Sequence, residues 1–274
     1  MNDHVSITRA FNGEEFKVLF KDTLRPEDSG GLFPPLEPGS TVVDGIQLDR
    51  DVPVTMRDGV TIYTDIYRPA GAIDVPAIVA WSPYGKRLRF VVEFVPGVPE
   101  GTISPATKME GVDPEYWCRR GYAVINPDPR GVGNSEGVVQ FFTQQEAQDT
   151  ADLIEFVATL DWCNGRVGMA GNSWLAIAQW SAAAQRPPHL ACIAPWEGST
   201  DVYRDIFRIG GIKEAGFLAW ALSGFFGAWA DGGLLLEHRP PPVPRRVLGR
   251  EGARRHCHRG PGLHHRLVEP PFPP

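Results

Sequence analysis

The chain has 274 residues, a formal net charge of −6 and 42% hydrophobic residues, which suits a globular protein with one large domain or two small ones. The mild acidity argues against nucleic acid as the main partner. No apolar stretch reaches the roughly 18 residues of a membrane helix, and the start shows no signal peptide, so we expect no membrane association and a cytoplasmic location.

The cysteines are scattered along the chain, at positions 118, 163, 192 and 257. Their spacing fits neither a disulfide framework nor a metal site, and we interpret three of them as buried thiols in a reducing compartment. We therefore expect no metal and no cofactor. The sequence leaves the oligomeric state open.

The first part of the chain predicts an irregular arm followed by a hairpin. Residues 1–40 are polar and interrupted by Gly and Pro, and we expect no regular structure there. Residues 50–68 contain two alternating runs around Asp58-Gly59. Asp-Gly between such runs indicates a β-hairpin, because Gly tolerates the positive φ of a type I′ turn.

Strand-like and helix-like segments alternate from residue 75 onward. The apolar, strand-like runs are 75–81, 122–127, 166–171 and 190–196. The helix-like runs are 113–120, 144–160 and 174–185. This alternation predicts an α/β fold with a mainly parallel, doubly wound sheet and the antiparallel hairpin at one edge.

Composition indicates three parts in the chain after residue 40. We expect the α/β domain over 41–196, and the helical, aromatic stretch 197–237 predicts the start of a helical cap. Residues 238–274 form a tail rich in Arg, Pro and His without Lys or Asp. We interpret this tail as disordered or as the product of a shifted reading frame, so that the α/β domain would be truncated before its last strands.

The stretch V-G-M-A-G-N-S-W-L-A-I-A (167–178) places Ser173 at a tight corner between an apolar strand and a helix. This is the sequence form of a nucleophile elbow, in which a serine hydroxyl projects above the strand ends and the N–H groups of the helix start face a developing oxyanion. The alternative is that Ser173 simply caps the helix.

Five stretches together resemble the cocaine esterase / X-prolyl dipeptidyl-peptidase (CocE/NonD) family of α/β-hydrolases. They are M-R-D-G-V-T-I-Y-T-D-I-Y-R-P (56–69), S-P-Y-G-K-R (82–87), R-G-Y-A-V-I-N-P-D-P-R-G-V-G-N-S-E-G (120–137), D-W-C-N-G-R-V-G-M-A-G-N-S-W-L-A (161–176) and A-P-W-E-G (194–198). They follow the order and spacing of that family over about residues 50–236. The family's elbow reads G-x-S-Y-x-G, so Trp174 and Ala176 depart from it.

The resemblance implies roles for three residues. Ser173 would be the nucleophile that forms an acyl-enzyme. The backbone N–H of Trp174 would be one oxyanion donor, and Tyr84 matches the family tyrosine whose hydroxyl is the second. The alternative for Tyr84 is a surface residue of a turn.

Other residues near these motifs have less specific interpretations. Trp196 and Glu197 follow the strand 190–196, and both are candidates for the wall of the substrate's acyl pocket, although Trp196 could equally be core. We interpret Arg130, Asp149 and Asp152 as structural, with the arginine anchoring its loop and the aspartates on a solvated or paired helix face.

A serine nucleophile needs a histidine base and an orienting carboxylate, which follow the serine in α/β-hydrolases. After residue 237 the histidines are His238, His256, His258, His264 and His265, and the acids are Glu251 and Glu269. None follows a strand-like run, so the catalytic His and acid are not identifiable.

The resemblance implies a serine hydrolase, either an acyl esterase or an X-prolyl dipeptidyl-peptidase-like enzyme, acting on a small-molecule ester, amide or peptide. Without an identifiable base, we expect the activity to be impaired. The alternative is a non-catalytic pseudo-hydrolase that binds small molecules.

Overall fold

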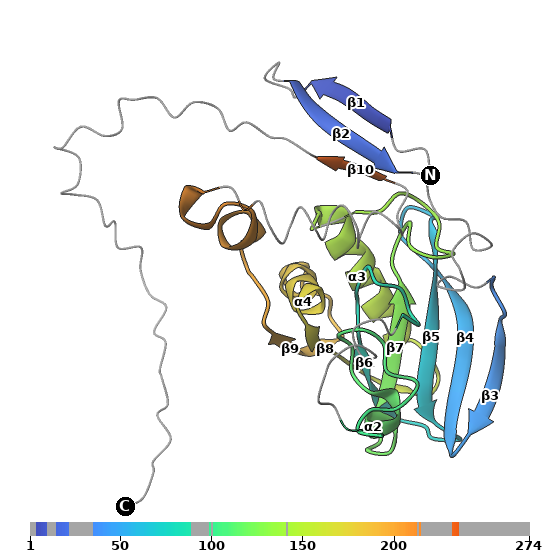
Figure 1. Ribbon diagram of the computed structural model, residues 1–274. Helices are drawn as coiled ribbons and strands as arrows, with labels where there is room; N and C mark the ends of the chain where they lie inside the picture. The colour runs from blue at the N-terminus through green and yellow to red at the C-terminus, as the bar shows by residue number, and fades with distance from the viewer. Residues whose placement is uncertain are drawn as a thin grey trace, which may run out of the picture. The chain divides into compact units, whose positions relative to one another are not determined.

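The computed structural model describes residues 4–9, 15–21, 35–88, 99, 101–140, 142–212, 214 and 232–235. Figure 1 shows the chain with its elements labelled. The main body is a seven-stranded sheet in the order β3-β4-β5-β7-β6-β8-β9. Its strands are β3 (Gly39–Val43), β4 (Ile46–Thr55), β5 (Thr61–Pro69), β6 (Val75–Val79), β7 (Ala123–Asp128), β8 (Cys163–Asn172) and β9 (Leu190–Trp196).

The sheet confirms the predicted fold class. Strands β7, β6, β8 and β9 are parallel to one another, whereas β3, β4, β5 and β7 pair in antiparallel fashion. All six residues of β7 are buried, as expected for a strand covered on both faces. The parallel strands place their carboxyl ends at one edge of the sheet, which is where binding loops gather in α/β folds.

The predicted hairpin is formed by β4 and β5, and it extends to a third antiparallel strand, β3. The connecting turn runs from Met56 to Val60, and the N–H of Met56 donates to the carbonyl of Val60 at 2.8 Å. Gly59 has a φ of +90°, but Asp58 is not among the residues with positive φ. The expected type I′ turn is therefore wrong, because that turn requires positive φ at both central residues.

Helices cover both faces of the sheet. Helices α3 (Gln144–Ala158) and α4 (Trp174–Ala184) pack on β6, β8 and β9, and they lie side by side in Figure 1. The short helix α2 (Pro114–Cys118) packs on β5 and β7. A large apolar cluster includes Leu153, Ile154 and Leu175 of α3 and α4, and a smaller one brings Trp117 against Val124. The domain is thus doubly wound around the parallel strands.

Local sequence explains where these helices begin. Asp113 accepts hydrogen bonds from two N–H groups of the first turn of α2, and Pro114 follows at the first helical position. Thr143 accepts from the N–H of Glu146 at 3.2 Å, while the Glu146 carboxylate accepts from the N–H of Phe142 at 2.7 Å. This arrangement is close to a capping box and fixes the start of α3.

The region predicted to be irregular contains strands. Over residues 1–40 the structure forms β1 (His4–Arg9), β2 (Glu15–Lys21) and the beginning of β3. Strands β1 and β2 pair in antiparallel fashion, and β10 (Gly232–Leu235) pairs with β2 to complete a three-stranded sheet. The expected arm is therefore partly regular.

The predicted cap segment 197–237 is described only in part. It contains a π-helical turn η2 (Tyr203–Phe207), a 3₁₀ turn η3 (Ile209–Gly211) and β10. The tail 238–274 lies outside the described residues. Of the cysteines with a described environment, Cys118 is buried, Cys163 is half-buried and Cys192 on the edge strand β9 is exposed, so the expectation of three buried thiols is wrong. In the described part of the chain, no helix is both long and apolar enough to cross a membrane.

Candidate active site

Ser173 stands between the last residue of β8 and the first residue of α4. Its φ of 56° and ψ of −116° are unusual for a residue other than glycine. A strained backbone of this kind costs about 1–3 kcal/mol and persists where the surroundings determine it. The predicted elbow is therefore present, with its serine in a strained conformation.

The side chain of Ser173 makes no capping hydrogen bond to α4. The backbone N–H of Ser173 instead donates to the carbonyl of Trp196 at 3.0 Å, and the carbonyl of Ser173 accepts from Ala176 and Ile177. The backbone is held on both sides while the hydroxyl is left for other partners. The alternative that Ser173 is a helix cap is wrong.

Two glycines make room for this corner. Gly171 has a φ of +145°, and a Cβ there would lie 2.4 Å from Leu175 Cδ2. Gly198, just beyond β9, would place a Cβ 2.5 Å from the Cβ of Ala176. Ala176, which departs from the family's elbow, is therefore accommodated by the missing side chain of Gly198.

The Trp174 side chain is directed into the core. It is 4% exposed, and its ring stacks on Phe142 with centroids 3.9 Å apart. Its indole Nε1 donates to Glu146 Oε1 at 3.0 Å, and the indole of Trp81 donates to the same oxygen at 3.2 Å. Burial raises the pKa of Glu146 to about 7, although both indoles favour its charged form. The indole thus anchors the helix start, whose backbone N–H is the candidate oxyanion donor.

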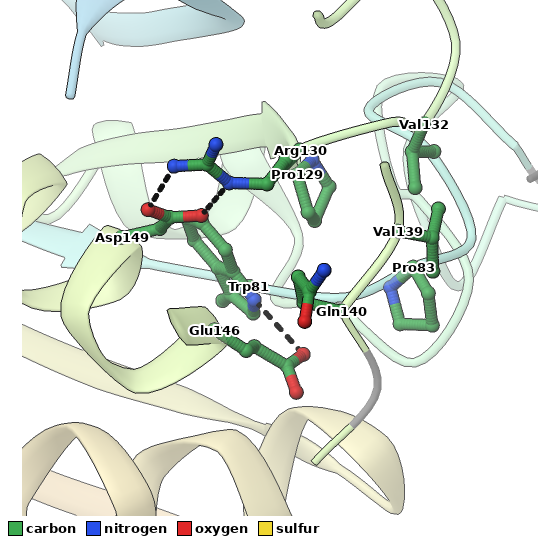
Figure 2. A pocket seen from close by; sticks show the side chains of 9 residues that line it. All are labelled: Trp81, Pro83, Pro129, Arg130, Val132, Val139, Gln140, Glu146 and Asp149. Atoms are coloured by element: carbon green, nitrogen blue, oxygen red, sulfur yellow. Dashed lines mark hydrogen bonds and ion pairs between the residues drawn. The ribbon is translucent and has the colours of Figure 1, made fainter. Parts of the chain in front are cut away.

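Figure 2 shows that Glu146 reaches Trp81 at the rim of a small cavity. The cavity volume is about 10 Å³, which is room for one water molecule. Neither Ser173 nor Tyr84 lines it. It is therefore a packing feature beside the elbow and not a substrate site.

Arg130 and Asp149 form a buried ion pair at the same cavity (Figure 2). Arg130 Nε and NH2 donate to the two Asp149 oxygens at 2.7 and 2.8 Å, and NH2 also reaches Asp58. Asp152, on the same helix, pairs with Arg57. These contacts confirm the structural interpretation of Arg130, Asp149 and Asp152.

Tyr84 lies in the turn that follows β6 and is only 3% exposed. The interpretation of Tyr84 as a surface turn residue is therefore wrong. Its hydroxyl interacts with the Ser173 hydroxyl and with the carboxylate of Glu110. Burial raises the pKa of Tyr84 well above its usual value, and the charge of Glu110 adds to this effect. The phenol is held in its neutral form, which can donate a hydrogen bond.

A buried ionic cluster holds the turn that presents Tyr84. Lys86 pairs with Asp128 and Asp51, and Arg87 pairs with Asp65 at 2.7 Å and with Asp51 at 3.0 Å. The three aspartates are at most 2% exposed. Removing one partner of such a cluster leaves an uncompensated buried charge, which costs several kcal/mol. The cluster therefore fixes Tyr84 relative to the strand ends.

Glu110 is the residue of this site that sequence reasoning missed. Its carboxylate interacts with the hydroxyls of Tyr84 and Ser173 and with the backbone N–H of Trp174. Burial raises the pKa of Glu110 to about 7; these three partners lower it, and the charge of Glu197 raises it further. Glu110 lies in an irregular loop, where no periodic sequence pattern indicates which side chains are buried. The local sequence shows only that an acidic residue stands shortly before a predicted helix.

Of the two residues predicted to line an acyl pocket, Trp196 ends β9 and Glu197 follows it. Trp196 is 59% exposed, so the alternative that it belongs to the core is wrong. Its side chain lines an apolar hollow of about 420 Å³ together with Ile78, Val112 and Trp117. Glu197, with a φ of +49°, is close enough to act on the charge of Glu110. Their role as pocket walls stays a prediction.

A histidine with a carboxylate partner does occur in the described chain, but at the other end of the sheet. His189 Nδ1 lies 2.7 Å from Glu155 Oε2 at the surface. His189 precedes β9, whereas Ser173 follows β8, and these strands are parallel over Val167–Asn172. At about 3.3 Å per residue the two ends are roughly 20 Å apart, so His189 is not the base for Ser173.

The described residues contain no group of three or more His, Cys, Asp or Glu side chains arranged to hold a metal ion. What the site brings together is a serine hydroxyl, a phenol, a helix-start N–H and a carboxylate. The phenol and the N–H are donors that can stabilise the oxyanion formed when a serine attacks a carbonyl group, whereas the carboxylate is itself an anion held among these donors.

Comparison with known sequences places these motifs in a recognised group. The profile of the X-Pro dipeptidyl-peptidase (S15) family matches residues 58–232, more than half of the chain. Cocaine esterase of Rhodococcus sp. is 35% identical over 164 residues, and the Xaa-Pro dipeptidyl-peptidase of Lactobacillus helveticus is 28% identical over 138 residues. Both matches are partial, covering 60% and 43% of this chain but only 26% and 17% of those proteins.

Comparison with solved structures agrees with the sequence result. A CocE/NonD family hydrolase from Staphylococcus aureus superimposes with a TM-score of 0.65 at 33% identity. The match covers 71% of this chain and 37% of that hydrolase. The chain therefore spans about a quarter of the length of cocaine esterase and about a third of this structural relative.

Proposed function

The chain belongs to the X-Pro dipeptidyl-peptidase (S15) family, whose members are hydrolases, and we propose that Ser173 forms an acyl-enzyme from a small ester or amide. The observation that carries the proposal is the backbone of Ser173, with φ 56° and ψ −116° and no capping bond for its hydroxyl. Strain of this kind, concentrated on one serine at the end of a parallel strand, is the geometry of a nucleophile elbow.

The reaction follows from the arrangement of the site. The Ser173 hydroxyl oxygen bonds to the carbonyl carbon, the carbonyl oxygen takes the negative charge, and the serine proton passes to a base. The Tyr84 hydroxyl and the Trp174 N–H donate to this oxyanion, and the amino end of α4 adds its positive partial charge. When this tetrahedral intermediate collapses, the alcohol or amine takes up the proton and leaves, and the acyl group stays on Ser173. Water then attacks the acyl-enzyme and releases the acyl group as a carboxylic acid.

The described residues place no imidazole beside Ser173. Of the histidines, only His189 has a described side chain environment, and it lies at the opposite end of the sheet. The Tyr84 hydroxyl and the Trp174 N–H would still stabilise the oxyanion, a donor of this kind being worth about 10²–10³-fold in rate, while solvent water takes the serine proton. We therefore propose slow acyl transfer by this chain.

The substrate class is a small ester or an X-prolyl amide, and the two relatives named above represent both. We propose no cofactor for this reaction, because acyl transfer to serine requires none. The scattered cysteines support a reducing compartment, and with it a cytoplasmic location for the chain.

The test is hydrolysis of p-nitrophenyl acetate by the purified full chain. We expect release of p-nitrophenolate that falls in Ser173→Ala, because the acyl-enzyme cannot form without the serine oxygen. Ser181→Ala is the matched control, since Ser181 lies within α4 and, in the described part of the chain, its hydroxyl donates to the carbonyl of Ala178. Equal release by the two variants would refute the role of Ser173. Glycyl-prolyl p-nitroanilide, assayed in parallel, separates peptidase from esterase activity.

A non-catalytic pseudo-hydrolase is the second candidate, and the absence of an imidazole near Ser173 among the described side chains favours it. In that case the chain should bind ester or peptide analogues, with a rise in Tm, yet show no release that depends on Ser173.

A further inference from the structure

The carboxylate of Glu110 lies where the groups of the proposed reaction meet. It interacts with the hydroxyls of Ser173 and Tyr84 and with the N–H of Trp174. These are the proposed nucleophile and both proposed oxyanion donors. A carboxylate oxygen carries negative charge, as the oxyanion of acyl transfer does, so these donors already hold an anion.

The position of Glu110 is built into the fold. Its backbone has a φ of +58°, and its carbonyl accepts a hydrogen bond from the N–H of Asn172, the residue before the nucleophile, at 3.1 Å. Lys108, two residues earlier, is 1% exposed and buried near the ionic cluster that holds the Tyr84 turn. The loop carrying Glu110 is thus fixed to the elbow at one point and to the core at another.

The carboxylate is held incompletely. Its Oε2 atom is buried and has no hydrogen-bond partner among the described residues. A buried oxygen without a partner carries a desolvation penalty that hydrogen bonding does not offset. An anion held in this way can leave when a better ligand for the donors arrives.

We propose that Glu110 is a gate of the oxyanion hole: its carboxylate occupies the Tyr84 and Trp174 donors in the resting protein and must be neutralised or displaced before a substrate carbonyl can bind. This inference rests on the proposed function of Ser173. Glu110 would then control whether a substrate carbonyl reaches the oxyanion hole, and this access would depend on the charge of the Glu110 side chain.

The surroundings of Glu110 determine the direction of the pH effect. The groups that face it are the Ser173 and Tyr84 hydroxyls, the Trp174 N–H and the carboxylate of Glu197. Burial, helped by Glu197, raises the pKa of Glu110 to about 7. Below this pH the carboxyl is neutral and is a weaker ligand for the donors, since hydrogen bonds to ions are about twice as strong. Above it the gate closes.

The test uses phenylboronic acid, whose boron bonds to a serine oxygen, releases one proton and forms a tetrahedral anion that needs the oxyanion hole. Its Kd is measured from about pH 6 to pH 9 for the full chain and for Glu110→Gln, an isosteric neutral variant. If only the neutral gate admits the adduct, the competent fraction at about pH 9 is about 1%. The ratio of Kd, unaltered chain over Glu110→Gln, should then rise from about 1 to about 100.

Two further variants make the comparison specific. Glu115→Gln makes the same substitution five positions later, on the exposed side of α2, and should keep the pH dependence of the unaltered chain. Glu110→Asp retains the charge but shortens the side chain, so it should weaken the gate. If Glu110→Gln does not fold, the ratio of Kd is taken for the unaltered chain over Glu110→Asp, and it should again rise with pH, by a smaller factor.

The outcomes separate the gate from the proposed function. A Kd ratio that stays constant with pH, or no adduct in Glu110→Gln at any pH, overturns the gate. Ser173→Ala in the Glu110→Gln background should abolish the adduct. If the adduct persists there while the ratio still rises with pH, the nucleophile is wrong and Glu110 closes an anion site that does not use Ser173.

Discussion

Replacement of Gly171 by alanine tests the construction of the elbow. A Cβ at this position would lie 2.4 Å from Leu175 Cδ2, 2.6 Å from its Cβ and 3.0 Å from its Cγ. Leu175 is 1% exposed, so its side chain has no solvent to move into. Overpacking of this kind costs about 1–3 kcal/mol. The φ of +145°, which L-residues rarely adopt, adds about 1–3 kcal/mol.

We expect Gly171→Ala to lower the free energy of unfolding by about 4 kcal/mol, a large part of the 5–15 kcal/mol typical of a domain. With a urea dependence of about 2.5 kcal/mol per molar, the unfolding midpoint should fall by about 1.5 M. The measurement is urea unfolding followed by tryptophan fluorescence, because Trp81 and Trp174 are both buried beside the elbow.

Gly39→Ala is the matched control. A Cβ at Gly39 meets no atom within 4 Å, and its φ lies outside the positive range. We expect a change below about 1 kcal/mol, in the stabilising direction. If the two alanine variants unfold at the same urea concentration, the steric account of the elbow is refuted.

Two further predictions concern buried charges. The Lys108 amine has no hydrogen-bond partner among the described residues, and burial lowers its pKa from 10.5 to about 7. The unfolded chain therefore binds more protons between these values, so stability should rise with pH over that range. Lys108→Met should flatten this rise and stabilise the protein at pH 7 by about 4 kcal/mol; a steeper rise or lower stability in urea titrations would contradict this. Arg130→Met should destabilise the protein by about 3–5 kcal/mol, because it leaves Asp149 of α3 charged and buried. Asp152→Asn, also on α3, removes the exposed ion pair with Arg57 and should cost under about 1 kcal/mol. Equal changes in Tm for these two variants would show that burial does not determine how much each ion pair contributes to stability.

The local parts of the site could be predicted from the sequence. The elbow at Ser173 depends on neighbours in the chain, namely an apolar strand, Gly171 and a helix, and those residues are enough to indicate it. The parallel strands were also predictable, since each is a short apolar run bounded by turn residues. The role proposed for Tyr84 came instead from the resemblance, because its distance from Ser173 depends on the folded sheet.

The features that were predicted wrongly or missed depend on contacts between residues distant in sequence. Strand β2 pairs with β1 and with β10, which lies more than two hundred positions away, and the alternation of Val5 and Ile7 was too short to reveal these strands. Trp196 is exposed because β9 is the edge strand of the described sheet. Glu110 reaches Ser173 only because its loop is bound to Asn172, which no spacing indicates.

The most direct test of the account is to locate the acyl group after reaction with p-nitrophenyl acetate. The full chain is treated with the ester, quenched in acid, digested and analysed by mass spectrometry. The account predicts one acetyl group, on the peptide that carries Ser173, and its absence in Ser173→Ala. Acetylation spread over surface lysines, with Ser173 unmodified in both the unaltered chain and Glu110→Gln, would contradict it.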